Sequence, residues 1–222
     1  MNAKLELLPS VIFCDLDGTL ADSMSALYSV YNAFLVHFGY SGTEEEFQAL
    51  MGPPLSQVVE ILRDRYALED TYEELHRQYI SLVKYYLERV PLIPGAQDFI
   101  KYGLSKKIRF YIVTAASRAY AERFIRSHSL ESYFEGIIAF EDAEMSKPHP
   151  APYLKALLLS RTPIEKAIAI EDSAGGVASS SSAGLKTFWL TDQGADKLDK
   201  AVWKEGICQV QNWQLIRELV YG

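Results

Sequence analysis

Several features of well-known protein classes are missing from this chain of 222 residues. It has only two cysteines, Cys14 and Cys208, and Cys14 lies in an apolar run typical of a buried strand, so no disulfide is expected. No segment approaches the roughly 18 consecutive apolar residues of a membrane span, and residues 1–10 lack the apolar stretch of a signal peptide. We therefore expect a cytoplasmic protein that does not span a membrane.

Basic residues are in the minority. The chain has 22 Lys and Arg against 29 Asp and Glu, a formal net charge of -7. A field of this sign repels nucleic acids and anionic membranes, so neither is expected as a partner. The phosphate-binding pattern G-x-x-x-x-G-K is also absent, which excludes a P-loop enzyme.

The composition that remains is that of a globular protein, with 49% hydrophobic and 23% charged residues. Residues 23–90 show helical periodicity without a convincing strand. In the first of these helical segments Leu27, Tyr31, Phe34 and Phe38 recur at intervals of three and four residues. This region is expected to form a bundle of helices.

Strand-like and helix-like segments alternate after residue 91. The strand-like segments are RFYIVT, EGIIAF, KAIAIED and KTFWL, and the last helical segment is WQLIRELV. Such alternation is typical of a mostly parallel sheet covered by helices on both faces. The expected fold class is therefore α/β, with a Rossmann-like core of three layers.

The spacing of the first two strands indicates an insertion. The first strand ends at Asp15 and the next strand-like segment ends at Thr114, far more than the roughly 30 residues of a βαβ unit. The helical region fits this gap. We expect a core domain of residues 1–21 and 91–222 and an inserted helical domain of residues 22–90.

Polar side chains follow several of the predicted strands at the point where each strand ends. In open parallel sheets, ligands bind outside the carboxyl ends of the strands. The side chains expected at that edge are Asp15, Asp17, Thr114, Lys147, Glu171 and Asp172.

Four carboxylates at one edge repel each other unless a cation is present. Mg²⁺ prefers oxygen ligands and is usually held by one or two carboxylates together with substrate phosphate and water. Lysine and threonine side chains can donate to phosphoryl oxygens, and a carboxylate can attack phosphorus as a nucleophile. The sequence therefore predicts a phosphoryl-transfer site that uses Mg²⁺.

Four segments together resemble the motifs of the haloacid dehalogenase (HAD) superfamily. They are DLDGTLADS, VTAAS, SKPHPAP and IEDSAGGV. The chain is similar to the phosphatase branch that includes phosphoglycolate phosphatases and β-phosphoglucomutases, and the similarity covers nearly the whole chain. It implies the HAD fold with an inserted α-helical cap domain, and a phosphoric monoester hydrolase.

The resemblance implies roles for five residues of the first three motifs. Asp15 is the nucleophile, and Asp17 is the general acid and then the base. Thr114 and Lys147 hold the transferred phosphoryl group, and Ala115 also contacts the substrate. The chemistry agrees, because crowding among carboxylates raises the proton affinity of one of them, as a general acid requires.

The same resemblance implies a set of Mg²⁺ ligands. These are the Asp15 carboxylate, the Asp17 carbonyl and Asp172, with Glu171 nearby. For the substrate, it points to Gly52 in the segment MGPPLSQ, because the corresponding cap loop reads the leaving group in this family. The expected partner is a small phosphorylated metabolite, and the protein is expected to be a monomer or weak dimer.

Arg118, just after the second motif, is a further candidate for contact with the substrate. Phosphoglycolate, a pyrimidine nucleotide, pyrophosphate and a sugar phosphate all remain open as substrates.

Two other functions remain as alternatives to a phosphatase. In a phosphosugar mutase the cap supplies a histidine and an arginine, and this chain has Leu27 and Leu55 at the matching places. A non-enzymatic protein with the same fold usually lacks a nucleophile or a metal ligand, and none is missing here. Dehalogenase chemistry is disfavoured by the presence of Asp17 and Asp172.

Overall fold

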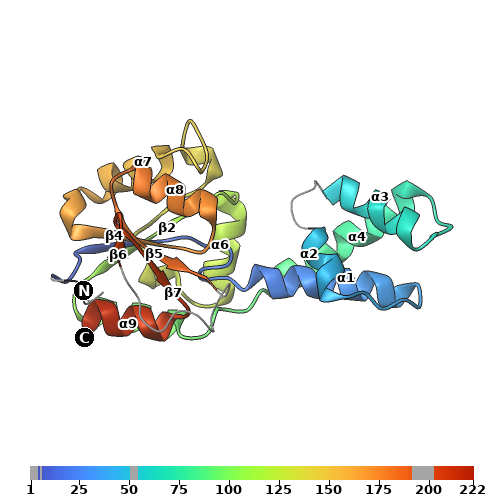
Figure 1. Cartoon of the computed structure of the whole chain (residues 1–222), viewed down its shortest axis with the longest axis horizontal. Coiled ribbons are helices and arrows are strands. Elements are labelled where there is room, and N and C mark those ends of the chain that lie inside the picture. The colour runs from blue at the N-terminus through green and yellow to red at the C-terminus, as the bar shows by residue number, and fades with distance from the viewer. Residues whose placement is uncertain (1–4, 6, 51–54, 192–202) are drawn as a thin grey trace. The chain divides into compact units, whose positions relative to one another are not determined.

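The computed structural model of the chain (Figure 1) describes residue 5 and residues 7–50, 55–191 and 203–222. The chain divides into two compact units. The core unit comprises Met1–Asp22 and Leu92–Gly222, and the helical unit comprises Ser23–Pro91.

A parallel sheet forms the centre of the core unit. Its strands are β1 (Val11–Cys14), β2 (Arg109–Val113), β3 (Gly136–Ile138), β4 (Ala167–Glu171), β5 (Lys186–Leu190), β6 (Trp203–Lys204) and β7 (Ile207–Val210). Within the described residues the strand order is β3-β2-β1-β4-β5-β7-β6, and every neighbouring pair is parallel except β6 with β7. Strand β1 therefore lies between β2 and β4. From β1 the chain adds β2 and β3 on one side and then returns to add β4 and the later strands on the other side.

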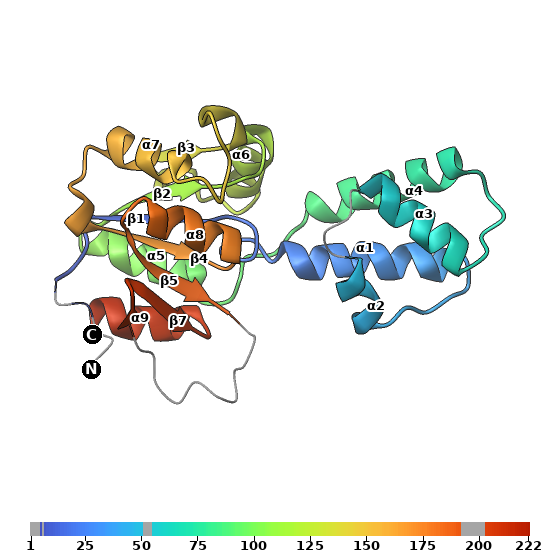
Figure 2. The same cartoon turned by 45° about the horizontal axis from the view of Figure 1, so that its top comes forward.

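Helices cover both faces of this sheet (Figures 1 and 2). They are α5 (Ala96–Ser105), α6 (Arg118–Ser127), α7 (Ala151–Ser160), α8 (Ala174–Ser182) and α9 (Trp213–Tyr221), with short 3₁₀ turns at Glu131–Tyr133 (η1), Phe140–Asp142 (η2) and Ile164–Lys166 (η3).

Successive side chains of a strand point to opposite faces, and the packing follows this rule. Phe13 of β1 packs against Tyr153 of α7 on one face, whereas Phe110 of β2 contacts Phe99 of α5 on the other. Phe99 also contacts Trp213 of α9. The predicted α/β class with a three-layer Rossmann-like core is confirmed.

The helical unit has its own apolar core. Its helices are α1 (Ser23–His37), α2 (Glu44–Ala49), α3 (Leu55–Arg65) and α4 (Tyr72–Leu87), and α4 packs along α1. At the start of α2, Thr43 Oγ1 accepts a hydrogen bond from Glu46 N at 3.1 Å. The Glu46 carboxylate accepts from the hydroxyls of Tyr31 and Tyr66, each at 2.5 Å, and from Arg65 at 2.7 Å. Glu46 therefore joins three helices of this unit.

Strands β6 and β7 lie in a stretch where the sequence indicates only a closing helix after KTFWL. Strand β7 has four residues and extends the parallel sheet beside β5. Its two buried side chains, Cys208 and Val210, alternate with the exposed Gln209, a pattern too short to identify a strand by itself.

Both cysteines are buried and free in the structure. Among the described residues, no helix combines the length and apolar character that crossing a bilayer requires.

Candidate active site

Asp15 is the first residue after β1 and is 7% exposed. Its backbone N–H donates to the Ile170 carbonyl at 3.0 Å, which continues the pairing of β1 with β4. The chain then turns at Gly18, where φ is +79°. A Cβ atom at Gly18 would lie 1.9 Å from Asp172 Oδ2, so only glycine lets this turn pass beside Asp172.

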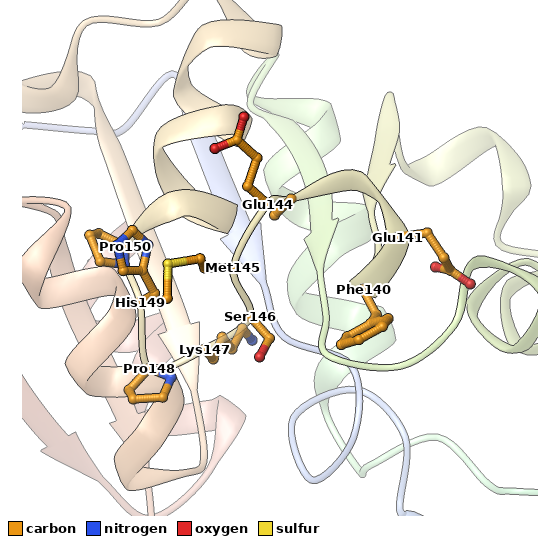
Figure 3. A pocket seen from close by; sticks show the side chains of 10 residues that line it. Phe140, Glu141, Glu144, Met145, Ser146, Lys147, Pro148, His149 and Pro150 are labelled. Atoms are coloured by element: carbon orange, nitrogen blue, oxygen red, sulfur yellow. The ribbon is translucent and has the colours of Figure 1, made fainter.

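Lys147 reaches this edge from the loop after η2, where Figure 3 shows it with Ser146 and Pro148 at an open hollow. Its Nζ lies 2.6 Å from Asp15 Oδ1 and 2.8 Å from the carbonyl oxygen of Val113, at the end of β2. The Lys147 side chain is only 7% exposed. Two carboxylates, those of Asp15 and Glu171, outweigh the cost of this burial and raise the pKa of Lys147.

Glu171 is the last residue of β4, and its side chain is fully buried. Oε1 accepts hydrogen bonds from Lys147 Nζ and from the hydroxyl of Tyr153. Oε2 has no hydrogen-bond partner among the described residues. Burial, followed by the negative charge of Asp15, raises the pKa of Glu171, and Lys147 opposes this change.

Asp172 completes a cluster of three carboxylates. One oxygen each from Asp15, Glu171 and Asp172 lie within 4.8 Å of one another. Burial and the Asp15 carboxylate raise the pKa of Asp172 to about 7. Trp189 Nε1 donates to the Asp172 carbonyl at 2.8 Å and so holds its backbone.

This donor set fits a hard divalent cation such as Mg²⁺. All three residues offer carboxylate oxygens, and Glu171 also has a buried oxygen, Oε2, without a hydrogen-bond partner among the described residues. A cation would also offset the mutual repulsion of the three carboxylates, of which Lys147 neutralises only part.

Thr114 follows β2 at the same edge and is buried. Its N–H donates to the Ile138 carbonyl at 2.9 Å, and its Oγ1 accepts from Ala116 N at 3.0 Å, which fixes the start of the loop before α6. Ala115, the residue between them, is exposed.

Arg118 occupies the first position of α6, and its guanidinium donates to the carbonyl of Ile137 at 2.9 Å and to the Asp142 carboxylate. To contact a substrate, Arg118 would have to give up these bonds, so that role stays a prediction. Gly52 lies outside the described residues.

Two tyrosines at this edge were not identified from the sequence. Tyr153 donates to Glu171, and the hydroxyl of Tyr120 donates to Asp17 Oδ1 at 3.1 Å. The sequence contained one indication of a role for Tyr120. It lies in the first turn of a helix that starts at the carboxyl edge of the sheet, where ligands bind.

Comparison with known proteins gives the family. Residues 11–190 match the family model of the haloacid dehalogenase-like hydrolases. The chain is 26% identical over 181 residues to a phosphorylated carbohydrates phosphatase of Thermotoga maritima, covering 81% of this chain and 83% of the relative. It is 29% identical over 182 residues to the pyrophosphatase PpaX of Anoxybacillus flavithermus, covering 80% and 81%.

A solved structure shows the same fold. The Bacillus subtilis protein YfnB, bound to magnesium, superimposes with a TM-score of 0.73 at 18% identity, over 97% of this chain and 100% of YfnB. The resemblance noted from the four motifs is thus confirmed by the family match. This chain belongs to the haloacid dehalogenase-like hydrolase family.

Proposed function

We propose that this protein is a Mg²⁺-dependent phosphatase that hydrolyses a small phosphomonoester through an aspartyl-phosphate on Asp15. The observation that carries the proposal is the buried contact of 2.6 Å between Lys147 Nζ and Asp15 Oδ1, beside Glu171 and Asp172. The phosphatase and pyrophosphatase activities named for the two relatives support hydrolytic transfer of a phosphoryl group as the reaction class.

The first half of the reaction uses Asp15 and Asp17 together. A carboxylate oxygen of Asp15 forms a bond to phosphorus while the bond from phosphorus to the ester oxygen breaks. The electron pair of the broken bond stays on the ester oxygen, which takes a proton from Asp17 and leaves as the alcohol. Asp17 is then ionised and Asp15 carries the phosphoryl group.

The second half returns both groups to their starting states. Asp17 removes a proton from water while the water oxygen forms a bond to phosphorus. The bond between phosphorus and Asp15 breaks, and its electron pair regenerates the Asp15 carboxylate. One phosphomonoester and one water molecule give one alcohol and one inorganic phosphate.

Lys147 has two tasks in this scheme. Its ammonium group orients the Asp15 carboxylate through Oδ1, and its charge stabilises the added negative charge of the phosphoryl oxygens. The hydroxyl of Thr114, at the end of β2, can donate to the same oxygens.

The Mg²⁺ ion would be held by Asp15, the Asp17 carbonyl and Asp172, with Glu171 close to these ligands. When bound, Mg²⁺ supplies positive charge that offsets the charge of the phosphoryl group. The fit of the carboxylate cluster supports this assignment, as does the magnesium bound to the structural relative YfnB.

The experiment is a phosphate-release assay on small phosphomonoesters and pyrophosphate, first with Mg²⁺ and then with a chelator. We expect release that requires Mg²⁺ and is lost in Asp15→Asn, whereas Asp70→Asn, an exposed change in the helical unit, keeps it. Transfer between positions of a sugar without release would instead indicate a mutase. No turnover of any member of the panel would favour a non-enzymatic role.

The physiological substrate, the cytoplasmic location, the monomeric or weakly dimeric state and the role of the helical unit as the cap domain stay predictions.

A further inference from the structure

Tyr120 makes a contact that the proposed reaction does not yet use. Its hydroxyl donates to Asp17 Oδ1 at 3.1 Å, although 103 positions separate the two residues in the chain. Both belong to the core unit, and both side chains are partly buried. The contact therefore links helix α6 directly to the residue assigned as the general acid.

The start of α6 fixes the backbone of Tyr120. Tyr120 is the third residue of the helix, and its N–H lies 3.3 Å from Oγ of the N-cap residue Ser117. The preceding turn is tied by the bond of 3.0 Å from Ala116 N to Thr114 Oγ1. The inner side of the helix is buried through Ala121, Phe124 and Ile125. The backbone that carries Tyr120 is thus fixed by a packed helix and a closed turn, and the bond to Asp17 orients its ring.

The hydrogen bond from Tyr120 makes the two carboxyl oxygens of Asp17 chemically different. A phenol with an ordinary pKa of about 10 is protonated at neutral pH and acts as a donor. Accepting this hydrogen bond lowers the proton affinity of Oδ1, which favours Oδ2 as the oxygen that carries the proton transferred by Asp17. The same bond restricts rotation of the carboxyl group about its last torsion, which has a broad distribution in proteins.

We infer that Tyr120 is a positioning residue for Asp17, which holds the carboxyl group with Oδ2 as the oxygen that gives and takes the proton. The inference rests on the proposed function, because it requires Asp17 to act as the general acid. A positioned acid matters most where the leaving group needs its proton.

The test compares two probes with different leaving groups. Glycerol 2-phosphate releases an alkoxide, which must be protonated as it leaves, whereas p-nitrophenyl phosphate releases a stabilised phenolate that does not need the proton. The quantity measured is kcat/KM, which covers all steps up to departure of the leaving group and leaves out hydrolysis of the aspartyl-phosphate. The variant is Tyr120→Phe, which keeps the ring and removes only the hydroxyl.

For Tyr120→Phe we expect kcat/KM with glycerol 2-phosphate to fall about 10-fold, and kcat/KM with p-nitrophenyl phosphate to fall less than about 2-fold. Asp17→Asn should show the same selectivity with a loss of about 100-fold or more on glycerol 2-phosphate. Tyr221→Phe is the matched control, since Tyr221 is also partly buried and its hydroxyl donates to the Phe99 carbonyl at 3.3 Å. It should leave both values unchanged.

The outcomes separate this inference from the proposed function. If Tyr120→Phe lowers both values equally, or neither, the positioning role is wrong while the phosphatase remains. If Asp17→Asn itself shows no selectivity between the probes, the acid role of Asp17 is wrong. If the wild-type chain releases phosphate from neither probe, the proposed function is contradicted and the inference falls with it. A thermal unfolding curve of Tyr120→Phe that matches the wild type confirms that the fold is intact.

Discussion

Lys147 Nζ and Asp15 Oδ1 lie 2.6 Å apart, and 132 positions separate the two residues along the chain. Their side chains are only 7% and 9% exposed. Charged groups at this depth persist only when they are paired and hydrogen-bonded. The ammonium group also contacts Glu171, so one lysine compensates two buried carboxylates.

Replacing Lys147 by methionine should destabilise the metal-free protein. The change leaves Asp15 and Glu171 buried without their cation, and breaking a buried pair in this way costs about 3 to 5 kcal/mol. The free energy of unfolding, measured in urea at pH 7 with a chelator present, checks the value. Lys166→Met is the control, since Lys166 is exposed and its loss should change the stability by less than about 0.5 kcal/mol. Equal stability of the two variants would contradict the role given to Lys147.

Two adjacent glycines of α8 provide a sharper test of the carboxylate cluster. A Cβ atom at Gly176 would lie 1.9 Å from Glu171 Oε2, whereas one at Gly175 meets no atom within 4 Å. Gly176→Ala should displace Glu171 and, through it, Lys147, and lower kcat/KM by about 100-fold. Gly175→Ala should keep the activity and raise the free energy of unfolding by about 0.5 kcal/mol, because alanine is the better helix former.

Measurements of kcat/KM and of urea unfolding for these two variants test whether the position of Glu171 matters to the reaction. A Gly176→Ala variant with wild-type activity would show that the position of Glu171 does not matter to the reaction.

The helical unit should show a pH-dependent stability that depends on Glu46. Burial opposes ionisation of Glu46, but hydrogen bonds from Tyr31, Tyr66 and Arg65 outweigh it and lower its pKa. A lowered pKa in the folded state stabilises the protein fully above the unfolded value of about 4.3, and this stabilisation is lost as the pH falls through the folded value.

Glu46→Gln should therefore lower the free energy of unfolding at pH 7, by about 1 to 2 kcal/mol. The difference from the wild type should shrink below about pH 4, where Glu46 is protonated as well. Urea unfolding followed by circular dichroism at several pH values measures this difference. Glu45→Gln, an exposed neighbour in α2, should show no such trend. A constant difference across the pH range would mean that the charge of Glu46 contributes nothing.

Much of the fold followed from the sequence because its signals are local. Strand β1 is a run of four apolar residues, and a parallel strand buried on both faces requires such a run. The polar residues directly after the strands, such as Asp15 and Asp172, are carried to one edge by the topology alone. Their meeting within 4.8 Å, together with Glu171, agrees with that reasoning.

The contacts that were not predicted depend on tertiary packing. Thr43 and Glu46 fit the sequence pattern of a capping box, yet the Glu46 side chain accepts from Tyr31 on α1 and from Tyr66, which directly follows α3. Tyr120 has an ordinary helical position, and only the packing of α6 shows that its hydroxyl meets Asp17. Periodicity describes which face a residue occupies, but not which partner it finds there.

The central claim is that Asp15 carries the phosphoryl group during the reaction. The most direct test is to incubate the Asp17→Asn variant with Mg²⁺ and p-nitrophenyl phosphate, quench it in acid and analyse its peptides by mass spectrometry. Because Asp17 is needed to activate the water, the intermediate should accumulate, and we expect one added phosphoryl group on Asp15 that is absent from Asp15→Asn. A phosphoryl group on a different residue, or none while the wild type turns over the same substrate, would contradict the account.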